Sequence, residues 1–489
     1  MVFFILGYFF MKKITLILVS LCWAIVLIAQ DIVFNKTYNA QTPGLSNIII
    51  QEDGYVSLGF DVNLGKVRIY ILKTDFYGDT IWTKKYGSSD YSFYNGTQNS
   101  LIENFNGGHS LSSHRTNPET DYRACMLMKF DQNFDTLWTK LYFDNPDFTV
   151  FYNHIQTADG GYALVGCTTE SDTDGDVLLV KTDSDGNMLW YKKYGTSGRD
   201  MGLCIVETTD NGFLIGGECG LGNTDGYLVK TDSGGNQQWT QRYGNPLYPD
   251  GAIFTIGVTS ENEYIIPLTS YVTDPISEDF YNRKYNIIKL NSDFSEVWNK
   301  QYGVRAEHTG LASINIASNG DILATIEDNY QCGLFRISYD GDSIWKHYYS
   351  APNVTNELCG LLALKQTDDG GFIMAGVAYE PQVMWLVKTD SCGCVVEDCE
   401  CGGSAVESFW LNNEIEVYPN PAKDVLYLNF PENTKDLRVE IYDNLGRQII
   451  TNELLGWENS IDVKQLKAGN YFVRIVSDNR NWRGWFVKE

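Results

Sequence analysis

One short pattern recurs seven times along the chain: a basic residue, a turn that contains Asp and Gly, and then Trp-x-Lys-x-Tyr. The clearest copies begin at Lys73, Lys181 and Lys230. The residues that start the copies recur at intervals of roughly 50 residues, and they are Lys73, Lys129, Lys181, Lys230, Lys289, Arg336 and Lys388. Such a period of strand-like segments predicts a toroidal or solenoidal array rather than one continuous core.

Each repeat is predicted to form four antiparallel strands. In the third repeat, the strand segments are residues 153–157, 162–168, 176–182 and 189–194. The segments are separated by turns rich in Gly, Asp and Asn, which accept positive φ. Four-stranded units repeated seven times predict an all-β fold, a seven-bladed β-propeller.

The last repeat lacks its fourth strand. Lys388 is followed by Glu397 at the position where the pattern expects Trp, whereas residues 34–38 (Phe-Asn-Lys-Thr-Tyr) match Trp-x-Lys-x-Tyr closely. We therefore expect the first strand of the mature chain to complete the last blade. This arrangement would pair an open strand edge and close the ring.

The repeated tryptophans have two interpretations. The Asp-x-x-Gly-x-x-x-Trp spacing of Asp75, Gly78 and Trp82 resembles the tryptophan-docking motif of quinoprotein-like propellers, which implies that each indole packs against the neighbouring blade. The alternative is a surface on which sugars stack. The amino-acid sequence of the repeats is also similar to that of surface repeat proteins of Bacteroidetes-type bacteria. The tryptophans concerned are Trp82, Trp138, Trp190, Trp239, Trp298 and Trp345.

The first 30 residues have the pattern of a signal peptide. Lys12 and Lys13 precede the apolar residues 14–28, and Ala29-Gln30 provides a cleavage point. Met11 is an alternative start. The apolar stretch is short for a membrane span, and we predict no transmembrane segment in the mature chain.

The net charge indicates which partners are disfavoured, and the cysteines indicate where disulfides and buried thiols are expected. The formal net charge of -25 disfavours nucleic acid and anionic lipid, whose phosphates require clustered Lys and Arg. In an exported chain, the cluster Cys392, Cys394, Cys399 and Cys401 predicts local disulfides, with a zinc site as the alternative. The cysteines inside predicted strands are expected to be single buried thiols, and they are Cys125, Cys167, Cys204, Cys219, Cys332 and Cys359.

A second domain follows the propeller. We assign residues 31–401 to the propeller, 402–413 to a linker and 414–489 to a small Ig-like β-sandwich of short strands. This last domain resembles the type A C-terminal sorting domain of the type IX secretion system. The resemblance rests on spaced motifs that comprise Tyr418, Pro419, Asn420, Pro421, Asp443, Gly446, Arg447, Gly469, Tyr471 and Lys488.

The resemblance implies a route and two partners. The chain would pass through the Sec system to the periplasm and be recognised by the type IX translocon. A surface sortase would then remove the sorting domain within the linker. The cargo would finish attached to lipopolysaccharide on the outer surface, or free in the extracellular space.

The sequence offers no catalytic motif. The five histidines are scattered, and the segment Asp172, Asp174, Gly175 and Asp176 resembles only half of a calcium loop. We therefore expect no cofactor, with calcium at this loop as the alternative. The expected function is binding or scaffolding of a surface protein or glycan, without enzymatic activity. The alternative is an enzyme whose site lies at the central channel, either a quinoprotein-like oxidoreductase or a glycan-active hydrolase or lyase.

Overall fold

The computed structural model describes two compact units, Met1–Ser404 and Ala405–Glu489. Residues 1–30 and the predicted linker 402–413 lie outside the described residues. Within the described residues, no helix is both long and apolar enough to span a membrane. The described residues are 32–38, 44–63, 65–96, 100–117, 119–120, 122–143, 148–171, 174–196, 198–220, 225–244, 251–271, 283–306, 309–354, 358–395, 416–429, 437–443, 448–454, 460–477 and 480–489.

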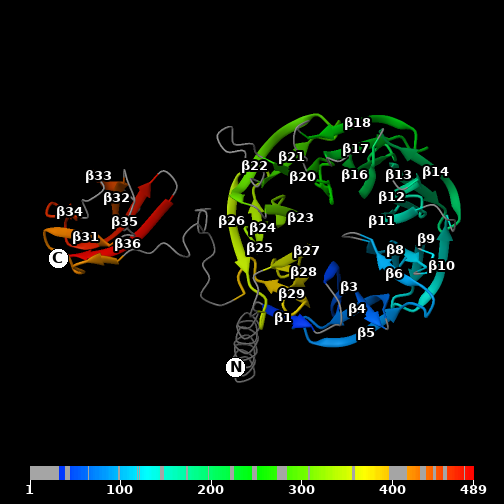
Figure 1. Ribbon diagram of the computed structural model, residues 1–489, viewed down its shortest axis with the longest axis horizontal. Helices are drawn as coiled ribbons and strands as arrows, with labels where there is room; N and C mark the ends of the chain where they lie inside the picture. The colour runs from blue at the N-terminus through cyan, green and yellow to red at the C-terminus, as the bar shows by residue number, and fades with distance from the viewer. Residues whose placement is uncertain are drawn as a thin grey trace, which may run out of the picture. The chain divides into compact units, whose positions relative to one another are not determined.

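In its described residues, the first unit consists of seven antiparallel sheets, each of which forms one blade. Figure 1 shows these sheets arranged radially in a ring, with β5, β14 and β18 on the outer rim. The first blade contains β2 (Leu45–Gln51), β3 (Gly54–Asn63), β4 (Lys66–Thr74) and β5 (Thr80–Tyr86). The second contains β6 (Ser92–Asn95), β7 (Leu101–Glu103), β8 (His109–Thr116), β9 (Arg123–Phe130) and β10 (Thr136–Tyr142). The third contains β11 (Phe148–Gln156), β12 (Tyr162–Ser171), β13 (Asp174–Thr182) and β14 (Met188–Tyr194).

The remaining four blades repeat the same up-and-down order. They contain β15 (Met201–Glu207), β16 (Phe213–Cys219), β17 (Asp225–Thr231) and β18 (Gln237–Tyr243); β19 (Gly257–Val258), β20 (Tyr264–Tyr271), β21 (Arg283–Leu290) and β22 (Glu296–Ala306); β23 (Thr309–Ile316), β24 (Ile322–Asp328), β25 (Gln331–Ile337) and β26 (Ser343–Tyr349); and β27 (Cys359–Gln366), β28 (Phe372–Ala378), β29 (Val383–Thr389) and β1 (Phe34–Tyr38). The predicted propeller fold is therefore confirmed.

Strand β1 closes the ring as predicted. It pairs antiparallel with β29, with Phe34 opposite Lys388 and Tyr38 opposite Met384. The last blade thus has the order β27-β28-β29-β1, and its outermost strand comes from the N-terminal part of the chain, residues 34–38.

The cores of the propeller lie between blades rather than inside them. One apolar cluster joins Leu45 and Ile48 of the first blade to Met384 and Leu386 of the last. The middle strands are buried on both faces, as β17 is throughout its length. Continuous apolar runs such as Val177–Val180 are the sequence signature of this double burial.

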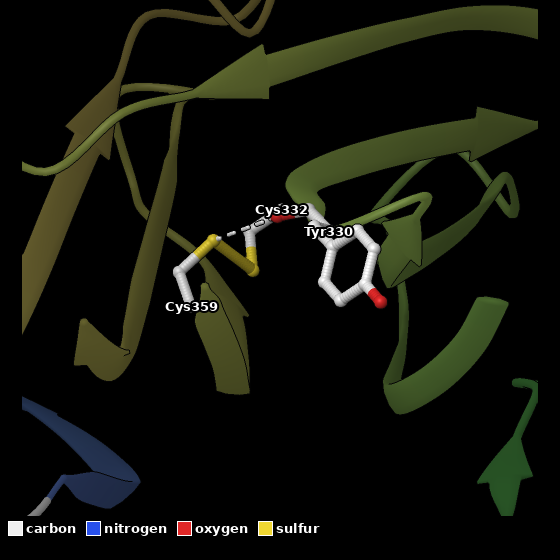
Figure 2. Close-up of a disulfide and its surroundings, with 3 residues drawn as sticks. All are labelled: Tyr330, Cys332 and Cys359. Carbon is white, nitrogen blue, oxygen red and sulfur yellow. Dashed lines mark hydrogen bonds between the residues drawn. A yellow bond between two sulfur atoms is a disulfide. The ribbon is translucent and has the colours of Figure 1, made fainter. Parts of the chain in front are cut away.

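The prediction of single buried thiols was wrong for two cysteines. Cys332 in β25 and Cys359 in β27 form a disulfide with a Cα–Cα distance of 6.0 Å, which links the sixth blade to the seventh (Figure 2). The two cysteines are 27 residues apart in sequence, and the packing of neighbouring blades brings their thiols together. The other four strand cysteines are free and buried, as expected, and they are Cys125, Cys167, Cys204 and Cys219.

The second unit is a β-sandwich of two antiparallel sheets around one apolar core. Leu426, Val439, Ile441, Val473 and Phe486 form the centre of this core, and both sheets contribute to it. The first sheet has the order β30 (Glu416–Tyr418), β31 (Val425–Asn429) and β34 (Ser460–Asp462). The second has the order β33 (Gln448–Leu454), β32 (Leu437–Asp443), β35 (Gly469–Ser477) and β36 (Arg480–Lys488).

Candidate functional site

The repeated tryptophans pack against the next blade. Each lies against the turn between the third and fourth strands of that blade, and in four of the six cases a positive-φ glycine in this turn leaves room for the indole. A Cβ on Gly186 would lie 2.7 Å from the ring of Trp138, and the same relation joins Trp190 to Gly235. Trp298 contacts Gly341 and Trp345 contacts Gly393 in the same way. Trp82 instead packs on Phe134, with ring centroids 5.6 Å apart. Trp239 packs on Phe294, with ring centroids 5.3 Å apart.

The tyrosine of each motif binds the same turn. Tyr142 donates a hydrogen bond of 2.6 Å to the carbonyl oxygen of Gly186, and Tyr194 donates one of 2.7 Å to Gly235. Burial raises the pKa of both hydroxyls. The lysine between Trp and Tyr adds a further contact, as Lys300 does to Asp342 at 2.9 Å. The face of the outer strand that carries these three residues is therefore occupied by contacts between blades.

Six of the seven basic residues that start the repeats are buried, and the seventh, Arg336, is partly exposed; all seven have polar partners. Lys230 is only 1% exposed, and its Nζ lies 2.8 Å from Asp210 on the turn between the first two strands of the same blade. Lys181 and Asp159 form the equivalent pair at 2.9 Å. Burial alone would raise the pKa of both carboxyls, but the lysine and neighbouring threonine hydrogen bonds lower it to about 2. These lysines join two turns of one blade.

The cysteine cluster begins inside the propeller rather than after it. Cys392 and Cys394 flank Gly393 on the docking turn of the seventh blade, where both backbone N–H groups donate to Asp390 at 2.8 Å. Tyr349 donates to the Gly393 carbonyl at 2.8 Å. Cys392 and Cys394 are each disulfide-bonded, while Cys399 and Cys401 lie outside the described residues. The Asp390-x-x-Gly393 spacing was the sequence signal for this turn.

The two faces of the ring differ in regularity. The turns between third and fourth strands have the same backbone hydrogen bond in all seven blades, as from Asp183 to Asn187. Together with the turns between first and second strands they form one face, the constant-turn face. At the opposite face, which we call the variable-loop face, the second strand of each blade ends and the third begins. The number of residues between these two strands varies along the chain, from residues 64–65 in the first blade to residues 272–282 in the fifth.

The described histidines, which are all but His308, lie in packing positions. His154 is 1% exposed and its Nε2 lies 2.8 Å from Ser110 Oγ, a distance typical of a base and a nucleophile. Ser110 is fully buried, so no substrate reaches it in this arrangement. His109 stacks on Phe134 with centroids 4.0 Å apart. Burial lowers the pKa of His154 to about 3, which keeps this ring neutral.

The described residues offer no metal centre. They contain no group of three or more His, Cys, Asp or Glu side chains that could hold a metal ion. In the calcium-like segment, Asp174–Thr182 forms strand β13, while Asp172 lies outside the described residues. A calcium site at this segment stays a prediction without support.

The predicted sorting motif gathers at one edge of the second unit. Asn420 Oδ1 accepts a hydrogen bond of 2.9 Å from the Val487 N–H, and its Nδ2 donates to the Trp485 carbonyl at 3.3 Å. The Ala422 N–H donates to the Val487 carbonyl at 2.7 Å. The segment from Tyr418 to Ala422, which contains Pro419 and Pro421, therefore pairs with the edge of the last strand, β36. Both X-Pro bonds of this segment are cis.

Other motif residues pair with the same strand or lie close by. Gly469 and Tyr471 are opposite Lys488 and Phe486 in the ladder of β35 and β36. The Tyr471 hydroxyl donates to the Lys467 carbonyl at 3.0 Å. Asp443 ends β32 opposite Tyr471, while Gly446 and Arg447 lie outside the described residues. The motifs that are far apart in sequence thus converge around β35 and β36.

Comparison with known proteins identifies the second unit. Residues 416–489 match the family model described as the secretion system C-terminal sorting domain. No curated protein matches the chain. The solved structures that it resembles include the extracellular domain of a putative hybrid two-component system from B. thetaiotaomicron, with 11% identity, a TM-score of 0.44, and 93% of this chain and 59% of that chain covered.

Two further solved structures are similar at the same level. One is a polysaccharide lyase, with 10% identity, a TM-score of 0.44, and 72% of this chain and 91% of that chain covered. The other is the β-propeller domain of a protease from Pyrococcus furiosus, with 10% identity, a TM-score of 0.40, and 74% of this chain and 100% of that chain covered. The propeller assignment rests on the order of its own strands. Residues 416–489 are a secretion system C-terminal sorting domain, and the protein is exported by the type IX secretion system to the cell surface or the extracellular space.

Proposed function

We propose that this protein is a binding or scaffold module that engages a protein or glycan outside the cell through the variable-loop face of its propeller. The supporting observation is the contrast between the two faces. The repeated Trp, Lys and Tyr side chains are used in contacts between blades, and the turns of the constant-turn face share one hydrogen-bond pattern. Loops of unequal length on a rigid scaffold are the usual location of binding residues.

We propose a role without catalysis, because the closest Ser–His pair in the described residues is buried.

The test compares two exposed tyrosines on opposite faces. Tyr379, 38% exposed, lies on the loop between β28 and β29, and Tyr77, 63% exposed, lies on the constant-turn face between β4 and β5. The mature chain is immobilised and used to capture outer-membrane proteins and surface polysaccharides. We expect Tyr379→Ala to weaken binding of the captured ligand by about tenfold, while Tyr77→Ala leaves it unchanged.

Two results would contradict the proposal. One is the absence of any specific ligand together with turnover of a glycan or a redox substrate by the wild-type chain. The other is a loss of binding in Tyr77→Ala that equals the loss in Tyr379→Ala.

A further inference from the structure

The second blade departs from the repeat in two ways. Its inner strand is divided into β6 and β7, which both pair with β8. Lys129 donates to the Tyr162 hydroxyl of the next blade at 2.9 Å, where Lys230 in the fourth blade binds a carboxylate. Departures from a local rule are concentrated at functional sites in natural proteins.

A groove of about 420 Å³ lies beside this blade. The end of β5 forms one wall, and the sheet of the second blade forms the other. We call it the flank groove and define it by Lys85, Phe93, Arg115, Met126, Met128 and Thr139, which line it. Its size falls in the range of small-ligand sites, roughly 300–1,000 Å³.

The flank groove combines an apolar floor with a polar outer wall. Leu141, which is 40% exposed, and the partly buried Phe93 supply the accessible apolar surface, while Met126 and Met128 are only 1% and 6% exposed and close the base of the groove. Thr136 and Thr139 of β10 are exposed and also line the groove. A ligand with one apolar face and a rim of hydroxyl groups fits such walls.

The charge of the flank groove opposes the charge of the chain. Its two charged lining residues, Lys85 and Arg115, are basic, although the chain has a net charge of -25. Lys85 Nζ lies 3.2 Å from Asp61, a carboxylate that Arg68 also binds. The Arg115 guanidinium lies over the ring of Tyr91, 4.3 Å from its centre. Both charged side chains that line the groove are therefore cationic.

We propose that the flank groove binds a carboxylated glycan, an oligosaccharide that contains uronic acid. The carboxylate would pair with Arg115 and Lys85, because charge-assisted hydrogen bonds to these groups are strong. The apolar face of the sugar ring would pack on Phe93 and Leu141, and its hydroxyls would form hydrogen bonds with Thr136 and Thr139. A peptide strand would instead pair its backbone with a free strand edge, and this groove lies against a sheet face. The proposal rests on the binding function proposed above.

The test uses the mature chain and a uronic acid trimer, trigalacturonate, titrated in a calorimeter at low salt. We expect the wild type to bind trigalacturonate but not its methyl ester. Arg115→Gln and Lys85→Gln should each weaken binding by about tenfold. Lys193→Gln is the matched control, because Lys193 precedes the last tyrosine of β14 as Lys85 precedes that of β5. It should bind like the wild type.

Several results would overturn the proposal. They are the absence of binding to trigalacturonate, equal binding of the methyl ester, unchanged affinity in both variants, and tighter binding of hexaglutamate than of the trimer. Lys85 is 40% exposed, so Lys85→Gln alone decides the question if Arg115→Gln does not fold. If Tyr379→Ala abolishes capture of a surface ligand but Lys85→Gln does not affect any ligand, this inference is wrong and the proposed binding function stands.

Discussion

Tyr38 donates a hydrogen bond of 2.6 Å to the carbonyl oxygen of Gly78, across the junction where the last blade meets the first. Lys36 binds Asp79 beside it, and the ring of Phe34 packs on Gly78. The closing junction therefore uses the same three positions as the interfaces within the ring, with Phe in place of Trp. Residues 34–38 are therefore a structural part of the propeller.

Removal of β1 should destabilise the whole propeller. Deletion of residues 31–38 would leave β29 as an open edge, which favours association of chains. We expect a lower urea midpoint and a larger species in size-exclusion chromatography. The milder change Tyr38→Phe should lower the free energy of unfolding by about 1 kcal/mol. Tyr142→Phe, at an interface within the ring, is its matched control and should cost a similar amount. An unchanged urea midpoint after the deletion would contradict closure by β1.

The docking glycines should tolerate no side chain. Gly186 has a φ of +76°, and a Cβ there would lie 2.7 Å from Trp138, whereas Gly160 has a φ of +83° with no atom within 4 Å of the added Cβ. Gly160→Ala should cost about 1–2 kcal/mol through the backbone alone. Gly186→Ala should cost a further 1–3 kcal/mol or so because it adds the clash. Chemical denaturation measures both, and equal costs would show that the indole moves aside without penalty.

Acid should destabilise the propeller in two stages. Burial lowers the pKa of His154 and His114 to about 3, with Arg123 adding to the effect at His114. The unfolded chain, whose histidines have a pKa of about 6.5, therefore binds these protons first, so stability present above that pH is lost as the pH falls toward 3. Asp159 and Asp210, with pKa values of about 2, add a second loss below pH 4 or so.

Urea midpoints measured from pH 8 to pH 3 test the first stage. His154→Gln removes one of the titrating groups, so its midpoints should fall less steeply with acid than those of the wild type. A wild-type stability that rises between pH 6.5 and pH 4 would refute this assignment.

Export of the protein should depend on the Asn420 side chain of the sorting domain. Asn420→Ala removes both side-chain hydrogen bonds to β36, from Val487 and to Trp485. We expect the variant to accumulate in the periplasm, which cell fractionation and immunoblotting would detect. Lys423→Ala, at a nearby residue that is 78% exposed, is the control and should reach the cell surface. Normal export of Asn420→Ala would mean that this edge is not required for recognition.

The repeat and the closing strand were predictable because both are local patterns. Phe34–Tyr38 has the same alternation of an aromatic residue, Lys and Tyr as the other outer strands. These five residues were therefore enough to predict that the segment forms the outer strand of a blade. The Cys332–Cys359 disulfide was not predictable, because it depends on which side chains of neighbouring blades come into contact. The seventh docking turn was overlooked although Asp390 and Gly393 have the right spacing, because the cysteines suggested a separate cluster. The flank groove has no sequence signal, since its walls come from two blades.

The position of β29 has a mechanical consequence for a protein held by its C-terminal side. Because β29 lies between β28 and β1, tension applied through the chain after Thr389 would act along two ladders at once. All the backbone bonds of both ladders would be sheared together, whereas an outermost strand would be peeled away one bond at a time. A surface protein built in this way should resist forces from flow and from neighbouring cells.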